Sequence, residues 1–474
     1  MITPHVQKNR GQLLFSVLVF AVVGTLFLTG LVGWAGINMK ALRSAGDREL
    51  AFHIAEAGID YYRWHLAHAP ADYRDGTATS GPYIHSFNNA AGEEIGSFTL
   101  DITAPQAGST IVTVTSTGAT LAEPLVTRTI RARLAIPSFA RFAWVLNSFV
   151  NFGSTAEVFG PIHSNAGLRF DGIAHNLVTS ATSTFDDPDH SGGVEFGVHT
   201  HDSPTDPLPP AAVPTRADVF EAGRQFPVPA VDFTGIISDL SQIKTDAQAS
   251  GRYIANSGSL GYHIVLRTND TFDLYRVTNL YSQSGCSCTG TGCTTMSIRP
   301  SNGQTFIANY AFPSNGLIFV EDHVWVDGTI NGARLTIASA RFPDNPSTRT
   351  SIIVNNDLRY TNYDGTDVIG LIAQNNFNVG LRSENDLRID AAVIAQNGRV
   401  GRFSYDTSCT DDTRDLLTTY GMLATNQRSA FWYGTNGYIA RDYIYDANLL
   451  YAPPPSFPLT SDQYTTISWE EIEE

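Results

Sequence analysis

Four cysteines are the residues of this chain with the most specific chemistry: Cys286, Cys288, Cys293 and Cys409. An even number of cysteines in an exported chain predicts disulfides, and four cysteines allow three pairings that the sequence does not distinguish. The first three lie close together, which would also suit a small metal site. However, a tetrahedral zinc site usually uses two short ligand pairs, and Cys409 stands alone. We therefore predict disulfides, with no metal and no cofactor.

Acidic residues and histidines offer a second kind of chemistry. Asp364 and Asp386 are 22 residues apart, and two neighbouring carboxylates could hydrolyse a glycosidic bond or bind a cation. Both stand in turn sequences, where Asp forms local hydrogen bonds, so we interpret them as turn residues. The segment 186–189 with Glu195 offers oxygen ligands but lacks the ordered spacing of a calcium loop. We interpret the histidine-containing segment 199–202 as a solvated loop.

Motifs of hydrolases and nucleotide-binding proteins do not occur in the sequence. It contains no nucleophile elbow, no H-E-x-x-H and no phosphate-binding glycine loop, so we predict no catalytic residues and no enzyme activity. The net charge of −16 also argues against nucleic acid as a partner. Several aromatic residues would either stack on sugar rings or pack internally, namely Tyr360, Tyr363, Tyr405, Phe431, Trp432 and Tyr433.

One uncharged apolar run, 13–37, is the candidate membrane anchor of the chain. It is long enough to cross a hydrocarbon core of about 30 Å as a helix. Lys8 and Arg10 precede it, which favours a cytoplasmic N-terminus and an exported remainder. No proline follows until Pro70, and apolar residues continue at helical spacing. We predict one helix over 12–68, with an apolar stripe on its second half that needs a partner.

Three segments in which apolar and polar residues alternate follow the helix and are expected to provide that partner. After a polar connection over 71–95, strands are predicted at 96–102, 110–115 and 126–134. Alternation with turn residues between the segments indicates an antiparallel meander with one buried face. The stripe on the helix is expected to cover this face.

The N-terminal region resembles the type IV pilin superfamily, and within it the PilX-like minor pilins. Residues 8–11 are similar to a prepilin leader, and Ala-Glu-Ala-Gly at 55–58 is similar to the end of the PilX-type helix. The resemblance implies cleavage between Gly11 and Gln12. It places Ser16 where major pilins have Glu, whose carboxylate pairs with the N-terminal amine of a neighbouring subunit. This departure puts a role as a repeating shaft subunit in doubt. The alternative is a plain signal anchor.

The remainder of the chain contains an internal repeat. Ile-Ala-Gln-Asn at 372–375 recurs at 394–397, Leu-Ala-Thr-Asn follows at 423–426, and 162–165 is a more distant echo. Short β-branched runs with this period predict a parallel β-helix whose asparagines stack at one corner. An ordinary β-sandwich is the alternative. A proline-rich segment, a helix near 233–247 and a hairpin over 261–277 interrupt the repeat. The segment 443–455 is expected to close the far end, before an acidic tail at 469–474.

The predicted fold is therefore mainly β: a long N-terminal α-helix on an antiparallel β-meander, followed by a right-handed parallel β-helix. The predicted parts are a leader-like segment (1–11), a membrane and pilin-like helix (12–68), a meander (71–147) and a β-helix (148–474) with an excursion at about 203–300. We predict a membrane-anchored, pilin-like protein of the cell envelope, a minor pilin or adhesin. Its expected partners are membrane lipid, other pilins and a surface glycan or protein. The alternative is a membrane-tethered polysaccharide lyase or hydrolase of the β-helix type.

Overall fold

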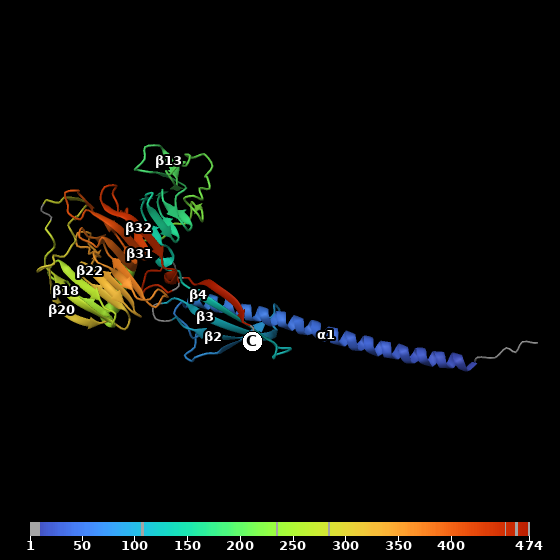
Figure 1. Ribbon diagram of the computed structural model, residues 1–474. Helices are drawn as coiled ribbons and strands as arrows, with labels where there is room; N and C mark the ends of the chain where they lie inside the picture. Colours follow the sequence, from blue (N-terminus) through green and yellow to red (C-terminus); the bar gives the residue numbers. More distant parts are fainter. Residues whose placement is uncertain are drawn as a thin grey trace, which may run out of the picture. The chain divides into compact units, whose positions relative to one another are not determined.

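The computed structural model describes residues 10–105, 109–233, 236–282, 285–450, 452–459 and 463–472. The chain divides into two compact units. Unit 1 comprises Met1–Ala104, Val112–Leu134 and Thr466–Glu474, and unit 2 comprises Pro105–Ile111 and Ala135–Thr465. The fold is mainly β with one long N-terminal helix, as predicted (Figure 1).

Helix α1 (Arg10–His68) belongs to unit 1, and its two halves have different surroundings (Figure 1). Large apolar side chains from Leu14 to Leu42 are exposed, including Phe20, which is 78% exposed, and Phe27. Within the described residues, this is the one helix long and apolar enough to cross a membrane. The buried stripe begins only at Ala51, somewhat later than the sequence pattern indicated.

The sheet of unit 1 contains the three predicted strands and two that the sequence did not reveal. Its order is β1-β2-β3-β4-β33. The strands are β1 (Tyr83–Asn88), β2 (Glu94–Thr103), β3 (Val112–Thr120), β4 (Thr127–Ala135) and β33 (Thr465–Ile472). Strands β1 to β4 form an antiparallel meander, and β1 lies in the segment that we expected to be a loop.

Strand β33 contains most of the predicted acidic tail. The sequence assigned 148–474 to the β-helix, whereas the structure places Thr466–Glu474 in unit 1. Glu471 pairs with Arg128 of β4, and Glu470 Oε1 lies 3.4 Å from Arg131 Nη1. Two arginines of β4 thus contact the acidic C-terminal strand.

The second half of α1 packs on the sheet through small residues. Ala51, Ile54 and Ala55 are fully buried. A Cβ atom on Gly118 of β3 would lie 2.1 Å from the carbonyl oxygen of Ala51, so only glycine permits this approach of strand to helix. Gly58, the last residue of the Ala-Glu-Ala-Gly segment, faces Phe98 and Ser116 at similarly short distances.

Unit 2 is a β-helix-like stack of parallel strands in three ladders. The first ladder runs β16 (Arg252–Ile254), β21 (Leu317–Val320), β23 (Arg334–Ser339), β26 (Val368–Ala373), β28 (Asp386–Ala395), β31 (Thr413–Thr425), β5 (Trp144–Leu146), β8 (Ile162–Ser164), β11 (Val178–Ser180) and β15 (Arg224–Gln225). The second contains β22 (Val324–Ile330), β24 (Ile352–Ile353), β27 (Phe377–Val379) and β29 (Val400–Arg402), and separately β6 (Val150–Phe152), β9 (Leu168–Phe170) and β14 (Val198–His199). The third contains β22, β25 (Leu358–Tyr360), β28, β31, β32 (Gly437–Tyr445), β7 (Ala156–Phe159) and β10 (Ile173–Ala174). Inward Ile, Leu, Val and Phe side chains form one continuous core.

The strands do not stack in sequence order. The chain enters the stack at β5, proceeds to β15, crosses to the opposite end at β16, and returns until β31 pairs with β5. In Figure 1 the red strands β31 and β32 accordingly adjoin teal strands from early in the sequence. Tyr443 of β32 pairs with Val158 of β7 in the interior of the stack. Our prediction that 443–455 closes the far end was therefore wrong, because this segment joins two passes of the chain.

The asparagine corner exists where these two passes meet. Asn147 Nδ2 donates to Asn426 Oδ1 at 2.7 Å, and Asn165 Nδ2 donates to Asn147 Oδ1 at 2.8 Å. One rung earlier, Asn397 Nδ2 donates instead to the backbone oxygen of Gln374. The predicted stacking of side-chain amides thus occurs at the junction of the passes.

The excursion contains the predicted helix and hairpin. Helix α2 (Ile236–Ala249) buries Leu240, Ile243 and Ala247. Strands β17 (Gly261–Leu266) and β18 (Thr271–Val277) form the antiparallel hairpin, which β20 (Gln304–Ala311) extends. Shorter elements complete the unit: η1 (Phe139–Arg141), β12 (Thr184–Asp186), β13 (Val194–Phe196), β19 (Cys288–Thr289), β30 (Ser404–Tyr405) and η2 (Ala447–Leu450).

Candidate functional site

A cavity of about 550 Å³ lies where the second ladder of unit 2 is interrupted. On one side are β5 and β6, and on the other is the segment 428–434. Strand β6 is the edge of its three-stranded sheet, and Ala430 bridges Gly401 of β29. Because the early and late passes of the chain do not pair here, the walls of the β-helix leave space between them.

Two polar atoms on the cavity wall have no hydrogen-bond partner within the described part of the chain. They are Trp144 Nε1, a donor, and Asn151 Oδ1, an acceptor, and both atoms are buried. The Trp144 ring is held edge-on against Phe152 and Tyr443, with centroids at 5.6 and 5.2 Å. Burial raises the pKa of Tyr443 to about 12, so its phenol stays neutral. Buried polar groups are normally paired, so the two unpartnered atoms indicate a polar ligand or ordered water.

Three arginines give the cavity a positive charge. Arg428 pairs with Asp189. Arg399 Nη1 donates to Tyr433 Oη at 2.7 Å, and the buried Arg441 donates to backbone oxygens of Tyr438 and Ile439. Within the described residues, no carboxylate forms an ion pair with Arg399 or Arg441, and the cavity lining contains no Asp or Glu. The cavity therefore presents two cationic groups without acidic partners, which favours an anionic ligand.

The predicted aromatic candidates separate into two groups. Tyr360, Tyr405 and Phe431 are buried and belong to packing. Trp432 is half-buried on the cavity wall, Tyr433 beside it is 36% exposed, and Tyr363 is exposed elsewhere. Sequence reasoning thus named Trp432 and Tyr433 but missed Trp144, Asn151 and Arg399. Their sequence neighbourhoods carry no signal for a site, because strands from different passes of the chain bring them together.

The two predicted carboxylates do not form a stacked pair in the ladder register. Leu358 pairs with Ile389, whereas Gly370 pairs with Ala392, so the spacing between paired residues differs on the two sides of the loop 361–367. The spacing changes because this loop interrupts only the earlier rung. Asp364 lies exposed in that loop and accepts hydrogen bonds from the amide and hydroxyl of Thr366, which lower its pKa. Asp386 is the exposed first residue of β28. The contacts of Asp364 match the predicted turn role.

The remaining predicted residues are placed as follows. Cys286 pairs with Cys409, and Cys288 pairs with Cys293, which selects one of the three pairings. The backbone of Gly11 and Gln12 is in the first turns of α1, whereas Met1–Asn9 of the leader-like segment lies outside the described residues.

The histidine segment departs from its prediction. We expected 199–202 to be a solvated loop, but His199 and Thr200 are fully buried. His199 ends β14 and pairs in register with Arg169 of β9, so it belongs to the stack and not to a loop.

Comparisons with known proteins find similar solved structures, one of which is described below. No family model matches the chain, and no curated protein matches it. The solved structure of the competence-associated pilin ComZ from Thermus thermophilus is similar at 12% identity and a TM-score of 0.30, over 90% of this chain and 98% of that one. A likeness at this level decides neither fold nor function.

Proposed function

We propose that the chain is a membrane-anchored, pilin-like surface protein, a PilX-like minor pilin or adhesin. The observation that supports this most strongly is the division of α1. Its first half exposes a continuous apolar surface, and its second half packs on an antiparallel sheet through Ala51, Ala55 and Gly58. A helix that enters lipid and continues into a folded unit matches the family that 8–11 and 55–58 resemble. The expected location is the cell envelope, with unit 2 outside the membrane.

Processing of the leader tests the pilin part of the proposal. If a prepilin peptidase acts on the chain, the envelope form starts at Gln12, and Gly11→Ala retains Met1–Gly11. Intact-mass measurement of the envelope protein gives the N-terminus directly. Gly24→Ala is the matched control, because nothing lies within 4 Å of a Cβ atom there and its processing should be normal. A wild-type protein that retains Met1–Gly11 would leave only a signal anchor.

The cavity of unit 2 supports an adhesin that binds an acidic glycan. Trp432 and Tyr433 offer aromatic surface for sugar rings, and Arg399 and Arg441 offer charge for carboxylate or sulfate groups. Glycoside hydrolysis by the common mechanism requires two carboxyl groups beside the bond. Since the described lining contains neither Asp nor Glu, we propose binding without turnover.

Titration of the full chain in detergent with a panel of acidic and neutral glycans tests this role. We expect an acidic glycan to bind, and Trp432→Ala and Arg399→Ala to weaken binding at least about tenfold, as loss of about 1.4 kcal/mol would. Tyr363→Ala is the control, because this exposed aromatic residue is not part of the cavity. Product formation that disappears in the double variant Asp364→Asn, Asp386→Asn would instead establish the enzyme.

A further inference from the structure

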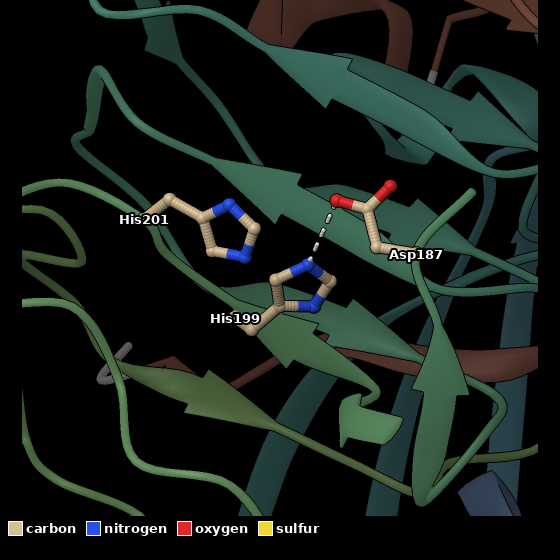
Figure 2. A group of neighbouring side chains, drawn as sticks. All are labelled: Asp187, His199 and His201. Carbon is tan, nitrogen blue, oxygen red and sulfur yellow. Dashed lines mark ion pairs between the residues drawn. The ribbon is translucent and has the colours of Figure 1, made fainter. Parts of the chain in front are cut away.

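A second group of polar side chains lies in unit 2 outside the cavity. It brings together the two segments that the sequence offered separately as ligands. Asp187 follows β12, His199 ends β14, and His201 lies two residues further on (Figure 2). One ligand atom from each of the three residues lies within 4.8 Å of the other two.

The atoms that face one another in this group lack hydrogen-bond partners. Asp187 Oδ2, His199 Nε2 and His201 Nε2 are all buried, and none has a partner among the described residues. The side chains of Asp187 and His199 are fully buried. Because His199 Nδ1 donates to the backbone oxygen of Phe196 at 2.9 Å, a neutral His199 has its lone pair on Nε2. That lone pair faces a carboxylate oxygen 3.5 Å away, and a metal cation bound between these two acceptors would give both atoms a partner.

Surrounding contacts hold the backbone of this group in place. The amide of His201 donates to Asp171 Oδ1 at 2.8 Å, and the amide of Thr200 donates to Asp206 Oδ2 at 3.1 Å. Arg224 pairs with Asp206, which fixes this carboxylate. The neighbouring cation, Arg169, lies 3.8 Å from Asp187 Oδ2, beyond hydrogen-bond distance.

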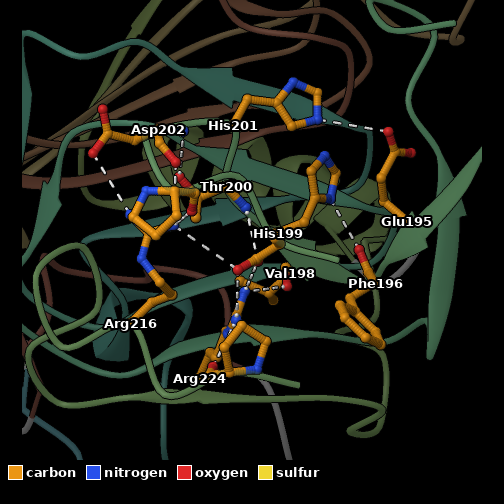
Figure 3. Close-up of polar contacts among 12 residues, drawn as sticks. Glu195, Phe196, Val198, His199, Thr200, His201, Asp202, Arg216 and Arg224 are labelled. Carbon is orange, nitrogen blue, oxygen red and sulfur yellow. Dashed lines mark hydrogen bonds and ion pairs between the residues drawn. The ribbon is translucent and has the colours of Figure 1, made fainter. Parts of the chain in front are cut away.

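Arg169 has closer partners of its own, since its Nε and Nη2 atoms bind Asp171 at 2.7 and 2.6 Å. A second carboxylate, Glu195, adjoins the group: its Oε1 lies 2.6 Å from His190 Nδ1 and 3.6 Å from His201 Nε2 (Figure 3). His201 Nε2 has no hydrogen-bond partner among the described residues, so this atom is also able to bind a metal.

We propose that Asp187, His199 and His201 bind one divalent transition metal ion, with zinc as the best match. Imidazole nitrogen and carboxylate oxygen are both common zinc ligands, whereas calcium prefers oxygen alone. Metal–ligand bonds of about 2.0–2.1 Å in a tetrahedral site place ligand atoms about 3.3 Å apart. The 3.5 Å between Asp187 Oδ2 and His199 Nε2 is close to this value. The ion would give a partner to all three unpartnered atoms and tie the β12–β13 hairpin to β14.

Zinc binding by the full chain, purified in detergent without a polyhistidine tag, tests the proposal. After chelator treatment, calorimetric titration with Zn²⁺ should show one site per chain, and Ca²⁺ should not occupy it. Asp187→Asn and His201→Gln should each weaken zinc binding at least about 100-fold. His175→Gln is the matched control, because His175 also contacts a glutamate, Glu221, but is not part of the group.

Two results would overturn the site. One is a wild-type chain that binds no Zn²⁺ at micromolar concentration. The other is zinc binding that is unchanged in both ligand variants. If the variants fail to fold, zinc-edge X-ray absorption of the wild-type chain decides: two imidazole nitrogens and a carboxylate oxygen support the site, and cysteine sulfur or a single imidazole contradicts it.

Discussion

The two units of this protein build their cores in different ways. Unit 1 packs a helix on an antiparallel sheet, and each contact occurs once, as at Gly118 against Ala51. Unit 2 repeats one arrangement, in which each parallel rung buries the same inward positions of the next. The stability of unit 1 therefore depends on a few irreplaceable contacts. Unit 2 depends instead on the links that hold distant passes of the chain together.

The disulfides of unit 2 give the largest expected effect. The Cys286–Cys409 bridge closes a separation of 123 residues, whereas Cys288–Cys293 closes one of 5. A longer closed loop restricts the unfolded chain more, so we expect the double serine variant of the first bridge to lose about 4 kcal/mol, and that of the second about 2 kcal/mol. Denaturant unfolding measures both. Equal losses of unfolding free energy for the two bridges would show that the length of the closed loop does not determine how much each bridge stabilises the fold.

A glycine in unit 1 gives the next effect. Gly118→Ala places a methyl group against the backbone of α1, where no side chain can move aside, so we expect a loss of about 3 kcal/mol. Gly46→Ala is the control: nothing lies within 4 Å of a Cβ atom there, and alanine favours a helix, so this variant should be neutral or slightly stabilising. Hydrogen exchange should increase in peptides of unit 1 alone. An unchanged Gly118→Ala protein would mean that the helix does not approach β3 so closely.

The asparagine junction of unit 2 should show a smaller effect. Asn147 joins the early and late passes through its hydrogen bond to Asn426, and it accepts a second bond from Asn165 of its own pass. Asn147→Ala should cost about 1 kcal/mol, a typical value for a partly exposed hydrogen-bonded side chain. Hydrogen exchange should increase at β5 and β31. Asn397→Ala, whose side chain donates to the backbone of Gln374, is the comparison within one pass of the chain. Faster exchange there than at the junction would contradict the importance of the link.

The smallest effect concerns a pH-dependent contact in unit 1. Hydrogen bonds from the amides of Arg74 and Gly76 and from His65 outweigh burial and lower the pKa of Asp72. A carboxyl whose pKa is lower in the folded state stabilises the fold above its unfolded pKa of about 3.9, and this contribution is lost as the pH falls. Asp72→Asn should therefore cost up to about 1 kcal/mol at pH 7 and less below pH 4.

Urea unfolding at a series of pH values measures this difference. Asp101→Asn, at an exposed position on β2, is the control and should show little change. A penalty for Asp72→Asn that is the same at pH 3 and pH 7 would mean that the charge of this carboxylate does not contribute.

Much of the local structure followed from the sequence. The absence of proline between Pro4 and Pro70 and the helical spacing of apolar residues predicted α1 to within two residues of its observed start at Arg10. The repeated tetrapeptide at 372–375 and 394–397 predicted paired rungs, and Ile372 does pair with Ile394. Such patterns are visible because a helix or a rung imposes its period on neighbouring residues of one segment.

The tertiary structure alone decided which segments meet. Only the fold pairs β31 with β5, adds β33 to the sheet of unit 1, and selects Cys409 as the partner of Cys286. The same holds for both sites, since Trp144 and Trp432 line one cavity and Asp187 Oδ2 lies 3.5 Å from His199 Nε2. Contacts between residues so far apart leave no period in the sequence. They depend on the path of the whole chain, which the burial of every rung against its neighbours determines.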